Sequence, residues 1–265
     1  MSRTDGVQAQ FEMQNLTPQN APDAALPTRI GARLAQVQTR IAAACRDAGR
    51  APQSVQLIAV SKTCPANAVR AAHAAGQIFF GENYVQEGIK KINALTGLPL
   101  EWHFIGPLQT NKTRVVAEHF AWVHGIDRLK IAERLSAQRP PHLQPLNVCI
   151  QINVDGAAGK SGVAPAEAAR LARAFAALPN LKLRGLMSIP EPVAGLDAQR
   201  APHRALRQLL EQLNRDSSVP ALDTLSMGMS ADLEAAILEG ATMVRIGTAI
   251  FGERNHERNY EGSDA

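Results

Sequence analysis

A single lysine stands where a short apolar segment gives way to a turn. Lys62 directly follows the small and apolar run Leu57–Ser61 and precedes the turn Thr63–Pro65. The run predicts a short buried strand with one lysine at its C-terminal end. A lysine in a partly dry site loses its charge readily, and the neutral amine attacks aldehydes to form a Schiff base. The alternative, which the spacing alone favours, is a surface lysine just past a strand.

A second segment that could take part in chemistry is Ser226–Glu234. A predicted strand ends there in glycine and hydroxyl residues, with Gly228 among them, and a helix begins. Backbone N–H groups and the helix dipole at such a junction favour an anion. Ser230 is the predicted N-cap of this helix, so helix capping alone is an equally weighted interpretation.

A third segment, Met243–Ile250, places an arginine within an apolar run. If Val244 and Ile246 pack outward, side-chain alternation points Arg245 into the protein interior. An inward arginine needs a partner, which is either a structural ion pair or a ligand with an anion or a ring nitrogen. Gly247-Thr248 then supplies N–H groups and a hydroxyl at the strand end.

Other candidate positions carry weaker signals. Asn83 ends the second predicted strand and either binds a ligand oxygen or stabilises the turn. Met187 follows the sixth strand and is a candidate for packing against a flat ring. His103 is expected to be a buried histidine with satisfied hydrogen bonds. The histidines and cysteines show no metal-ligand spacing, so no metal site is predicted.

Predicted strands and helices alternate along the chain. The strands are Gln56–Lys62, Ile78–Tyr84, Trp102–Gly106, Ala121–Asp127, Asn147–Asn153, Arg184–Ile189, Thr224–Ser230 and Met243–Ile250. The helices between them are Ala66–Ala75, Val85–Leu95, Lys112–His119, Arg128–Ala137, Pro165–Leu178, Ala198–Asn214 and Ala231–Glu239. Repeated βα units of this number predict an α/β fold, a closed (β/α)8 TIM barrel. A doubly wound open sheet is the alternative, weakened because no G-x-G-x-x-G follows the first strand. The loops after the seventh and eighth strands, where Ser226–Glu234 and Gly247-Thr248 lie, frequently form a phosphate site in such barrels.

An extra helix is predicted before the first strand. Thr28 is its expected N-cap, and it ends near Gly49. One apolar face is formed by Ile30, Leu34, Val37 and Ile41. We expect a disordered N-terminal tail over residues 1–26, a single barrel domain over 27–255 and a flexible C-terminal tail over 256–265.

Composition narrows the class of protein. The chain has 265 residues, 45% of them hydrophobic, which suits one domain with a sizeable core. Its formal charge of +4 is scattered without a basic block, so no nucleic-acid partner is predicted. No apolar run approaches the roughly 20 residues of a membrane span, and no secretory signal is visible. Three cysteines without paired spacing fit a reducing compartment, so the predicted location is cytoplasmic.

An amine, an anion site and an inward arginine together suit pyridoxal 5′-phosphate (PLP), an aldehyde with a phosphate and a ring nitrogen. The sequence also resembles the pyridoxal phosphate homeostasis proteins. The similar segments are Ala59–Lys62, Gly81–Tyr84, His103–Gly106, Gln109–Lys112, Lys160–Gly162, Ser226–Asp232 and Arg245–Thr248. They run in family order from about Gln56 to Gly252, and the family is similar to the N-terminal barrel domain of alanine racemase.

The resemblance implies roles for individual residues. Lys62 is implied to hold PLP as an aldimine, Arg245 to lie opposite the pyridine nitrogen, and Asn83 to lie near the ring. Contacts with the phosphate are implied for Ser226, Gly247 and Thr248. Gly228 and Met187 complete the predicted cofactor-binding set, and no catalytic residue is predicted.

Two functions of different classes follow from this site. The first is PLP homeostasis, in which the protein stores PLP or delivers it to PLP-dependent apoenzymes, with indirect effects on amino-acid and keto-acid balance. The alternative is a PLP-dependent amino-acid racemase, and a Schiff-base aldolase without PLP is a third possibility. An always-charged arginine keeps the ring nitrogen unprotonated, and a racemase needs acid–base groups on both substrate faces. We therefore predict a carrier that is a monomer or weak dimer, without established turnover.

Overall fold

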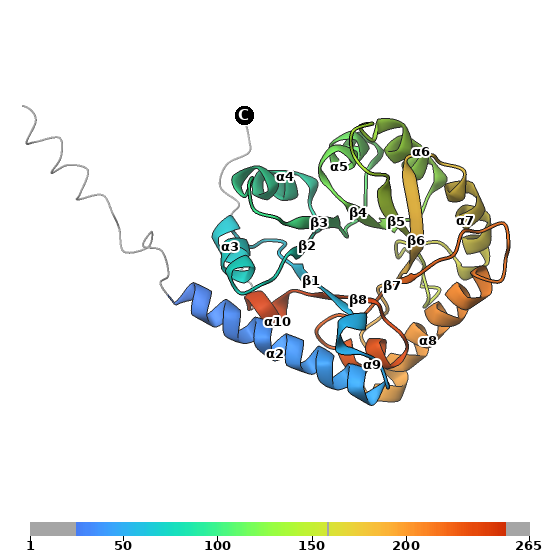
Figure 1. Cartoon of the computed structure of the whole chain (residues 1–265). Coiled ribbons are helices and arrows are strands. Elements are labelled where there is room, and N and C mark those ends of the chain that lie inside the picture. The colour runs from blue at the N-terminus through green and yellow to red at the C-terminus, as the bar shows by residue number, and fades with distance from the viewer. Residues whose placement is uncertain (1–24, 158, 253–265) are drawn as a thin grey trace, which may run out of the picture.

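The described part of the chain forms one closed barrel. The structure is a computed structural model and describes residues 25–157 and 159–252. Within them, the parallel strands β1 to β8 pair in chain order and β8 closes the ring against β1. Figure 1 shows the ring of strands enclosed by helices. The closed ring confirms the predicted TIM barrel and rules out an open sheet.

Strands alternate with helices along the chain. The strands are β1 (Gln56–Val60), β2 (Phe79–Glu82), β3 (Glu101–Phe104), β4 (Trp122–Ile126), β5 (Leu146–Gln151), β6 (Leu181–Met187), β7 (Thr224–Ser226) and β8 (Met243–Ile246). The α-helices are α2 (Leu26–Asp47), α3 (Ala66–Ala74), α4 (Val85–Ala94), α5 (Thr113–His119), α6 (Leu129–Gln138), α7 (Ala168–Ala176), α8 (Leu196–Leu213), α9 (Leu233–Leu238) and α10 (Thr248–Phe251). Short 3-10 helices are η1 (Pro52–Ser54), η2 (Thr110–Lys112) and η3 (Pro165–Glu167).

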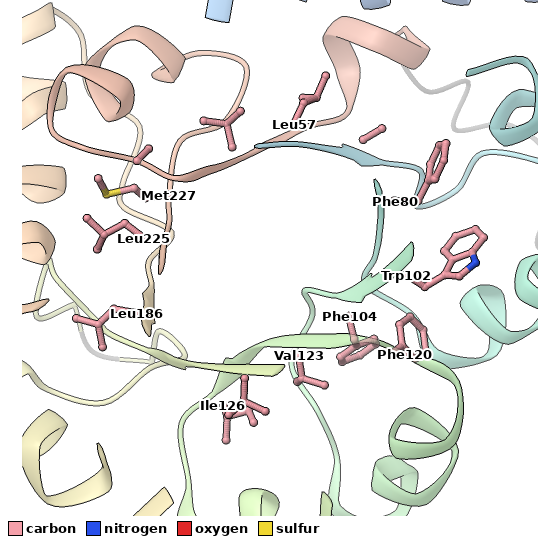
Figure 2. Close-up of a cluster of buried hydrophobic side chains, with 14 of the residues drawn as sticks. Leu57, Phe80, Trp102, Phe104, Phe120, Val123, Ile126, Leu186, Leu225 and Met227 are labelled. Carbon is pink, nitrogen blue, oxygen red and sulfur yellow. The ribbon is translucent and has the colours of Figure 1, made fainter. Parts of the chain in front are cut away.

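The larger hydrophobic core lies between the strands and the surrounding helices. Figure 2 shows Phe80, Val123, Ile126 and Leu225 pointing from their strands away from the barrel axis. All four are buried, together with apolar side chains of the helices. Each such side chain contributes about 1.5–3 kcal/mol when it leaves water, so this outer core supplies most of the hydrophobic stabilisation.

A second, smaller core fills the barrel itself. Its buried members are Ile58, Trp122, Cys149, Met187 and Met243. Side chains on a strand alternate between its two faces, so neighbours of these positions such as Leu57, Val123 and Val244 reach the outer core instead. The barrel interior is therefore packed, and any polar side chain that enters it must find a partner there.

Helix α2 is the predicted extra helix and packs against α3, α9 and α10 (Figure 1). The predicted apolar face is confirmed, because Ile30, Leu34, Val37 and Ile41 are all buried. The prediction that Thr28 caps the helix was wrong, because the helix begins at Leu26. Pro27 lies in the first turn, where its fixed φ suits a helix and its missing N–H costs no hydrogen bond.

Element boundaries near the ends of β1 and β8 differ from the predictions. Strand β1 ends at Val60, so Lys62 lies in the loop just beyond it. Strand β8 ends at Ile246 instead of Ile250, because the Gly247 carbonyl accepts the N–H groups of Ile250 and Phe251 and starts α10. An apolar run alone cannot distinguish such a short helix from a strand.

The predicted N-cap at Ser230 was also wrong. Helix α9 begins at Leu233, and Asp232 occupies the N-cap position. The Asp232 carboxylate accepts the Met229 N–H at 2.7 Å and therefore closes the preceding loop instead of capping the helix.

Residues 1–24 and 253–265 lie outside the described residues. The predicted disordered tail over 1–26 and flexible tail over 256–265 therefore stay predictions, apart from Leu26, which begins α2. Within the described ranges, no helix is long and apolar enough to cross a membrane.

Gly185 tests how tightly the barrel strands pack. A Cβ at this position would overlap the Thr224 carbonyl of the neighbouring strand β7. We expect Gly185→Ala to lower the free energy of unfolding by roughly 3 kcal/mol or more, because a backbone clash cannot relax cheaply. Gly31→Ala on α2 is the control, since its Cβ would meet only the Ala75 methyl at 3.7 Å. Urea unfolding of both variants measures the effect, and equal stabilities would contradict the packing argument.

Candidate functional site

One mouth of the barrel gathers most of the predicted functional residues. Lys62, Asn83, Gly228 and Gly247 follow the C-terminal ends of β1, β2, β7 and β8. The C-terminal ends of all strands in a parallel barrel open on the same mouth, so residues far apart in the sequence meet there. Thr248 also lies at this mouth, in the first turn of α10.

The backbone on both sides of Lys62 is held firmly. The Ser61 N–H donates to the Gly81 carbonyl at 3.0 Å, and the Ser61 hydroxyl donates to Glu82 Oε1. Thr63 has φ of +63°, a left-handed conformation that is costly for a β-branched residue, and its N–H donates to Glu87 Oε1. Strain of this kind persists only where surrounding contacts maintain it. The direction in which Lys62 leaves the chain is therefore fixed.

A buried lysine on α4 connects these contacts. Lys91 Nζ pairs with Glu82 and Glu87, each at 2.7 Å, and also donates to the Ser61 carbonyl. The Lys91 side chain is only 6% exposed and that of Glu82 is 0% exposed. Burial raises the pKa of the Glu82 carboxyl, and the neighbouring Lys91 ammonium partly offsets this. We call Lys91, Glu82 and Glu87 the acidic clamp, because they hold Ser61 and Thr63 on either side of Lys62.

Sequence reasoning missed the acidic clamp. The only available signal was the i, i+4 spacing of Glu87 and Lys91, which is common on exposed helix faces and contributes little there. Nothing in the sequence indicated that Lys91 turns toward the barrel and reaches the loop after β1.

Arg245 lies inside the barrel, as side-chain alternation predicts. It is 4% exposed, and its Nη1 and Nη2 atoms donate to Ser226 Oγ at 2.7 Å and to the Ser188 carbonyl at 2.8 Å. Burial lowers the pKa of Arg245 to about 10, with Asp232 and Cys149 opposing this shift. The guanidinium still carries its charge at neutral pH. These two bonds use two of the five N–H donors of the guanidinium.

Ser226 is engaged more deeply than predicted. Its hydroxyl lies 2.7 Å from both Arg245 Nη1 and His124 Nδ1, and the residue is completely buried. Ser226, the last residue of β7, therefore lies beside Arg245 of β8 and His124 of β4. It does not lie on the loop that follows β7.

Several polar atoms near the mouth have no partner among the described residues. Asn83 Oδ1 and Ser188 Oγ are both buried and make no hydrogen bond. A buried polar group without a partner costs about 1–3 kcal/mol, so such atoms mark places where a ligand could bond. Gly106 lets the Asn83 backbone pack closely against the end of β3, because a Cβ there would overlap it.

Two glycines allow the final loops to approach the barrel closely. Gly228 has φ of +92°, and its carbonyl accepts the Arg245 N–H at 3.0 Å. A Cβ on Gly247 would approach the Val60 carbonyl to 3.1 Å. Met187 is buried in the inner core, so it packs below this mouth. The loops after β7 and β8 thus lie beside the loop that carries Lys62.

Together these residues provide an amine at the mouth, a buried cation beneath it and unpartnered polar atoms nearby. The described residues contain no cluster of metal-ligating side chains. The arrangement suits a small molecule that has an electrophilic carbon for Lys62 and a ring or anion for Arg245.

Comparison with a family model defines the class of protein. Residues 33–255 match the model described as "Alanine racemase, N-terminal domain", which covers most of the chain. A crystal structure of alanine racemase from Corynebacterium glutamicum shares the fold, with a TM-score of 0.61 and 19% sequence identity. The match covers 86% of this chain and 62% of that one.

Similar proteins identify a narrower family. A pyridoxal phosphate homeostasis protein of Pseudomonas aeruginosa is 61% identical over 227 residues, covering 86% of this chain and 96% of the relative. The protein with the same name from Escherichia coli strain K12 is 54% identical over 234 residues, covering 86% and 98%. This chain belongs to the family of pyridoxal phosphate homeostasis proteins.

A solved structure supports the same grouping. PipY of Synechococcus elongatus has 39% sequence identity and a TM-score of 0.74, covering 84% of this chain and all of PipY. That protein has been solved both without PLP and with PLP bound. The resemblance that the sequence motifs indicated is therefore confirmed.

The acidic clamp can be tested by removing its cation. We expect Lys91→Met to lower the free energy of unfolding at neutral pH by about 3–5 kcal/mol, because Glu82 would remain buried without a counter-charge. Without Lys91 the pKa of Glu82 in the folded state rises further above its unfolded value. The destabilisation is then present at neutral pH and diminishes as the pH falls and Glu82 becomes protonated.

Urea unfolding at pH 7 and pH 5 measures this difference. Lys90→Met is the matched control, because Lys90 neighbours Lys91 in sequence but is exposed. The free energy of unfolding of Lys90→Met should stay within about 0.5 kcal/mol of the wild-type value. A Lys91→Met variant as stable as the control would show that the clamp does not support the loop.

Proposed function

We propose that this protein binds PLP in the barrel mouth and takes part in intracellular PLP homeostasis. The main support is the position of Lys62 at the barrel mouth and of Arg245 beneath it, in a chain that is 61% identical to a relative named for this role. PipY, at 39% identity, binds PLP within the same fold.

Each residue has a defined role in this proposal. When bound, PLP supplies an aldehyde that reacts with an amine. Lys62 is the amine, held by the acidic clamp, and Arg245 donates an N–H toward the ring nitrogen. Because Arg245 is charged, it disfavours protonation of that nitrogen.

The phosphate position rests on the loops after β7 and β8. We propose that Gly228, Gly247 and Thr248 supply the phosphate contacts through backbone N–H groups and the Thr248 hydroxyl. A role for Ser226 in holding Arg245 fits its hydrogen bonds better than the predicted phosphate contact. Asn83 Oδ1 and Ser188 Oγ are buried without partners, which suits a ligand with several polar groups.

We propose storage or delivery of PLP in preference to amino-acid racemisation. A racemase needs a proton donor and acceptor on opposite faces of the substrate. The similarity to alanine racemase, at 19% identity, establishes the fold alone. We further propose that PLP-dependent apoenzymes receive the cofactor, that the protein acts in the cytoplasm, and that it is a monomer or weak dimer.

Lys62→Ala tests the covalent attachment. We expect this variant to fold but to lose every borohydride-reducible PLP adduct, because no amine remains at that position. Lys182→Ala is the control, since Lys182 is exposed on β6. Absorption spectra before and after reduction, with mass spectrometry of the modified peptide, measure the outcome. A reducible adduct that persists in folded Lys62→Ala would place the attachment elsewhere. Racemisation of free amino acids by the loaded wild type would favour the enzyme alternative.

Arg245→Gln tests the contact with the ring. Replacing a charged donor with a neutral amide should weaken PLP binding by roughly 10- to 100-fold and shift its absorption band, because hydrogen bonds to charged groups contribute about 1.5–3 kcal/mol. Arg170→Gln is the control, because Arg170 is exposed on α7 and pairs with Glu167 outside the barrel. If affinity and spectrum are unchanged in folded Arg245→Gln, the arginine is only structural.

A further inference from the structure

A line of hydrogen-bonded side chains crosses the barrel interior below the site. Glu101 Oε1 lies 3.1 Å from His103 Nε2, and His103 Nδ1 lies 2.9 Å from His124 Nε2. His124 Nδ1 lies 2.7 Å from Ser226 Oγ, which accepts from Arg245 Nη1 at 2.7 Å. We call these five side chains the polar chain.

The polar chain connects the two ends of the barrel. Glu101 begins β3 at the N-terminal mouth, and its side chain is 40% exposed. His103, His124 and Ser226 are completely buried. The His103 ring also stacks on Trp122, with centroids 5.6 Å apart and planes at 10°. The chain therefore leads from solvent at one mouth to Arg245 beneath the other, through tightly packed side chains.

When both histidines are neutral, the atoms that can only donate or only accept fix the direction of every hydrogen bond in the polar chain. The Glu101 carboxylate can only accept, so His103 carries its proton on Nε2. His103 Nδ1 then accepts from His124 Nε2–H, and His124 Nδ1 accepts from the Ser226 hydroxyl. Arg245 can only donate, and it donates to Ser226 Oγ. In every hydrogen bond of the polar chain, the donor is thus the residue nearer Arg245 and the acceptor the residue nearer Glu101.

The surroundings favour this neutral state. Burial lowers the pKa of both histidines, and the neighbouring His103 and Arg245 lower the pKa of His124 further. For His103, the hydrogen bond and charge of Glu101 act against burial. Other ionisable groups nearby are Arg184, which acts on Glu101, and Asp232, which acts on Arg245. Cys149 also lies here, near Asp223, and its thiol stays neutral because burial raises its pKa to about 12.

One added proton on His103 would reverse the hydrogen bonds that join His103, His124 and Ser226. With a proton on both nitrogens, His103 donates to Glu101 and to His124 Nε2. His124 then carries its own proton on Nδ1 and donates to Ser226 Oγ. The Ser226 hydroxyl can no longer donate to His124 and must turn toward another acceptor near Arg245.

We propose that His103 and His124 are positioning residues of the cofactor site, which orient the Ser226 hydroxyl and through it the Arg245 guanidinium, and that Glu101 couples this orientation to the opposite mouth. This inference rests on the proposed PLP site. The geometry gives the histidines a role beyond filling the barrel, because a pair of apolar residues would leave Ser226 and Arg245 without this defined arrangement.

The first test needs no cofactor. Long-range proton–nitrogen correlation spectra of the 15N-histidine-labelled full chain report which nitrogen of each ring is protonated. We expect His103 and His124 to be neutral Nε2–H tautomers at pH 7.5. A charged ring, or a proton on His124 Nδ1 at this pH, would overturn the proposed direction of the chain.

A pair of variants tests the effect on PLP. An asparagine at position 124 can place an amide near the former Nδ1 and keep a bond to Ser226, whereas leucine cannot. We expect His124→Leu to weaken PLP binding about ten-fold, the effect of losing one buried hydrogen bond, and His124→Asn to restore most of it. Met243→Leu controls for packing, because Met243 belongs to the same inner core but not to the polar chain. Equal losses in all three variants would overturn the proposal.

Glu101→Gln tests the coupling across the barrel. Glu101 favours the protonated form of His103, so its replacement should move that protonation to lower pH. In the wild type we expect the absorption spectrum of bound PLP to change as the pH falls below the ordinary histidine range. In Glu101→Gln the same change should occur at lower pH. An identical pH profile in both proteins would overturn the coupling.

The two proposals fail in different ways. A wild-type protein that takes up no PLP would contradict the proposed function. The histidine tautomers, measured without cofactor, would still test the direction of the polar chain. A protein that binds PLP normally but shows the wrong His124 tautomer would remove only the polar chain.

Discussion

The buried positive charge of Arg245 is the constraint on which the barrel interior depends. A guanidinium at 4% exposure is costly unless its N–H groups meet acceptors. Two acceptors are already present, Ser226 Oγ at the end of β7 and the Ser188 carbonyl just after β6. Satisfying Ser226 in turn requires His124, and so the polar chain extends into the barrel. A single inward arginine thereby determines much of the inner core.

A second buried positive charge, that of Lys91, organises the polar groups at the mouth of the barrel. Lys91 reaches from α4 to the loop after β1 and contacts Glu82, Glu87 and the Ser61 carbonyl. The two cations differ in their setting, because Lys91 is paired with carboxylates whereas Arg245 donates to the neutral oxygens of Ser226 and Ser188. Lys91 is thus committed to structure, while Arg245 retains N–H groups for a ligand. This division separates the group that holds Lys62 from the group proposed to meet the ring.

The sequence predicted the closed barrel and the inward position of Arg245, both of which the structure confirms, but it did not reveal the residues that support them. Arg245 could be assigned to the interior because Val244 and Ile246 flank it and alternation on a strand is strict. The strand that was extended to Ile250 shows the limit of that pattern, since Gly247 turns the chain into α10. The acidic clamp and the role of His124 were missed because, apart from the Glu87–Lys91 pair, their bonds join residues 9 to 102 positions apart.

The sequence by itself determined the order of strands and helices, the inward face of β8 and the lysine at the end of β1, because these follow from local periodicity and composition. Only the tertiary structure decided what each polar side chain meets. Closing the barrel brings β4, β7 and β8 around one interior, so His124, Ser226 and Arg245 come into contact. Hydrogen bonds depend on distances of a few tenths of an ångström, and such distances are set by packing across strands and not by spacing along the chain.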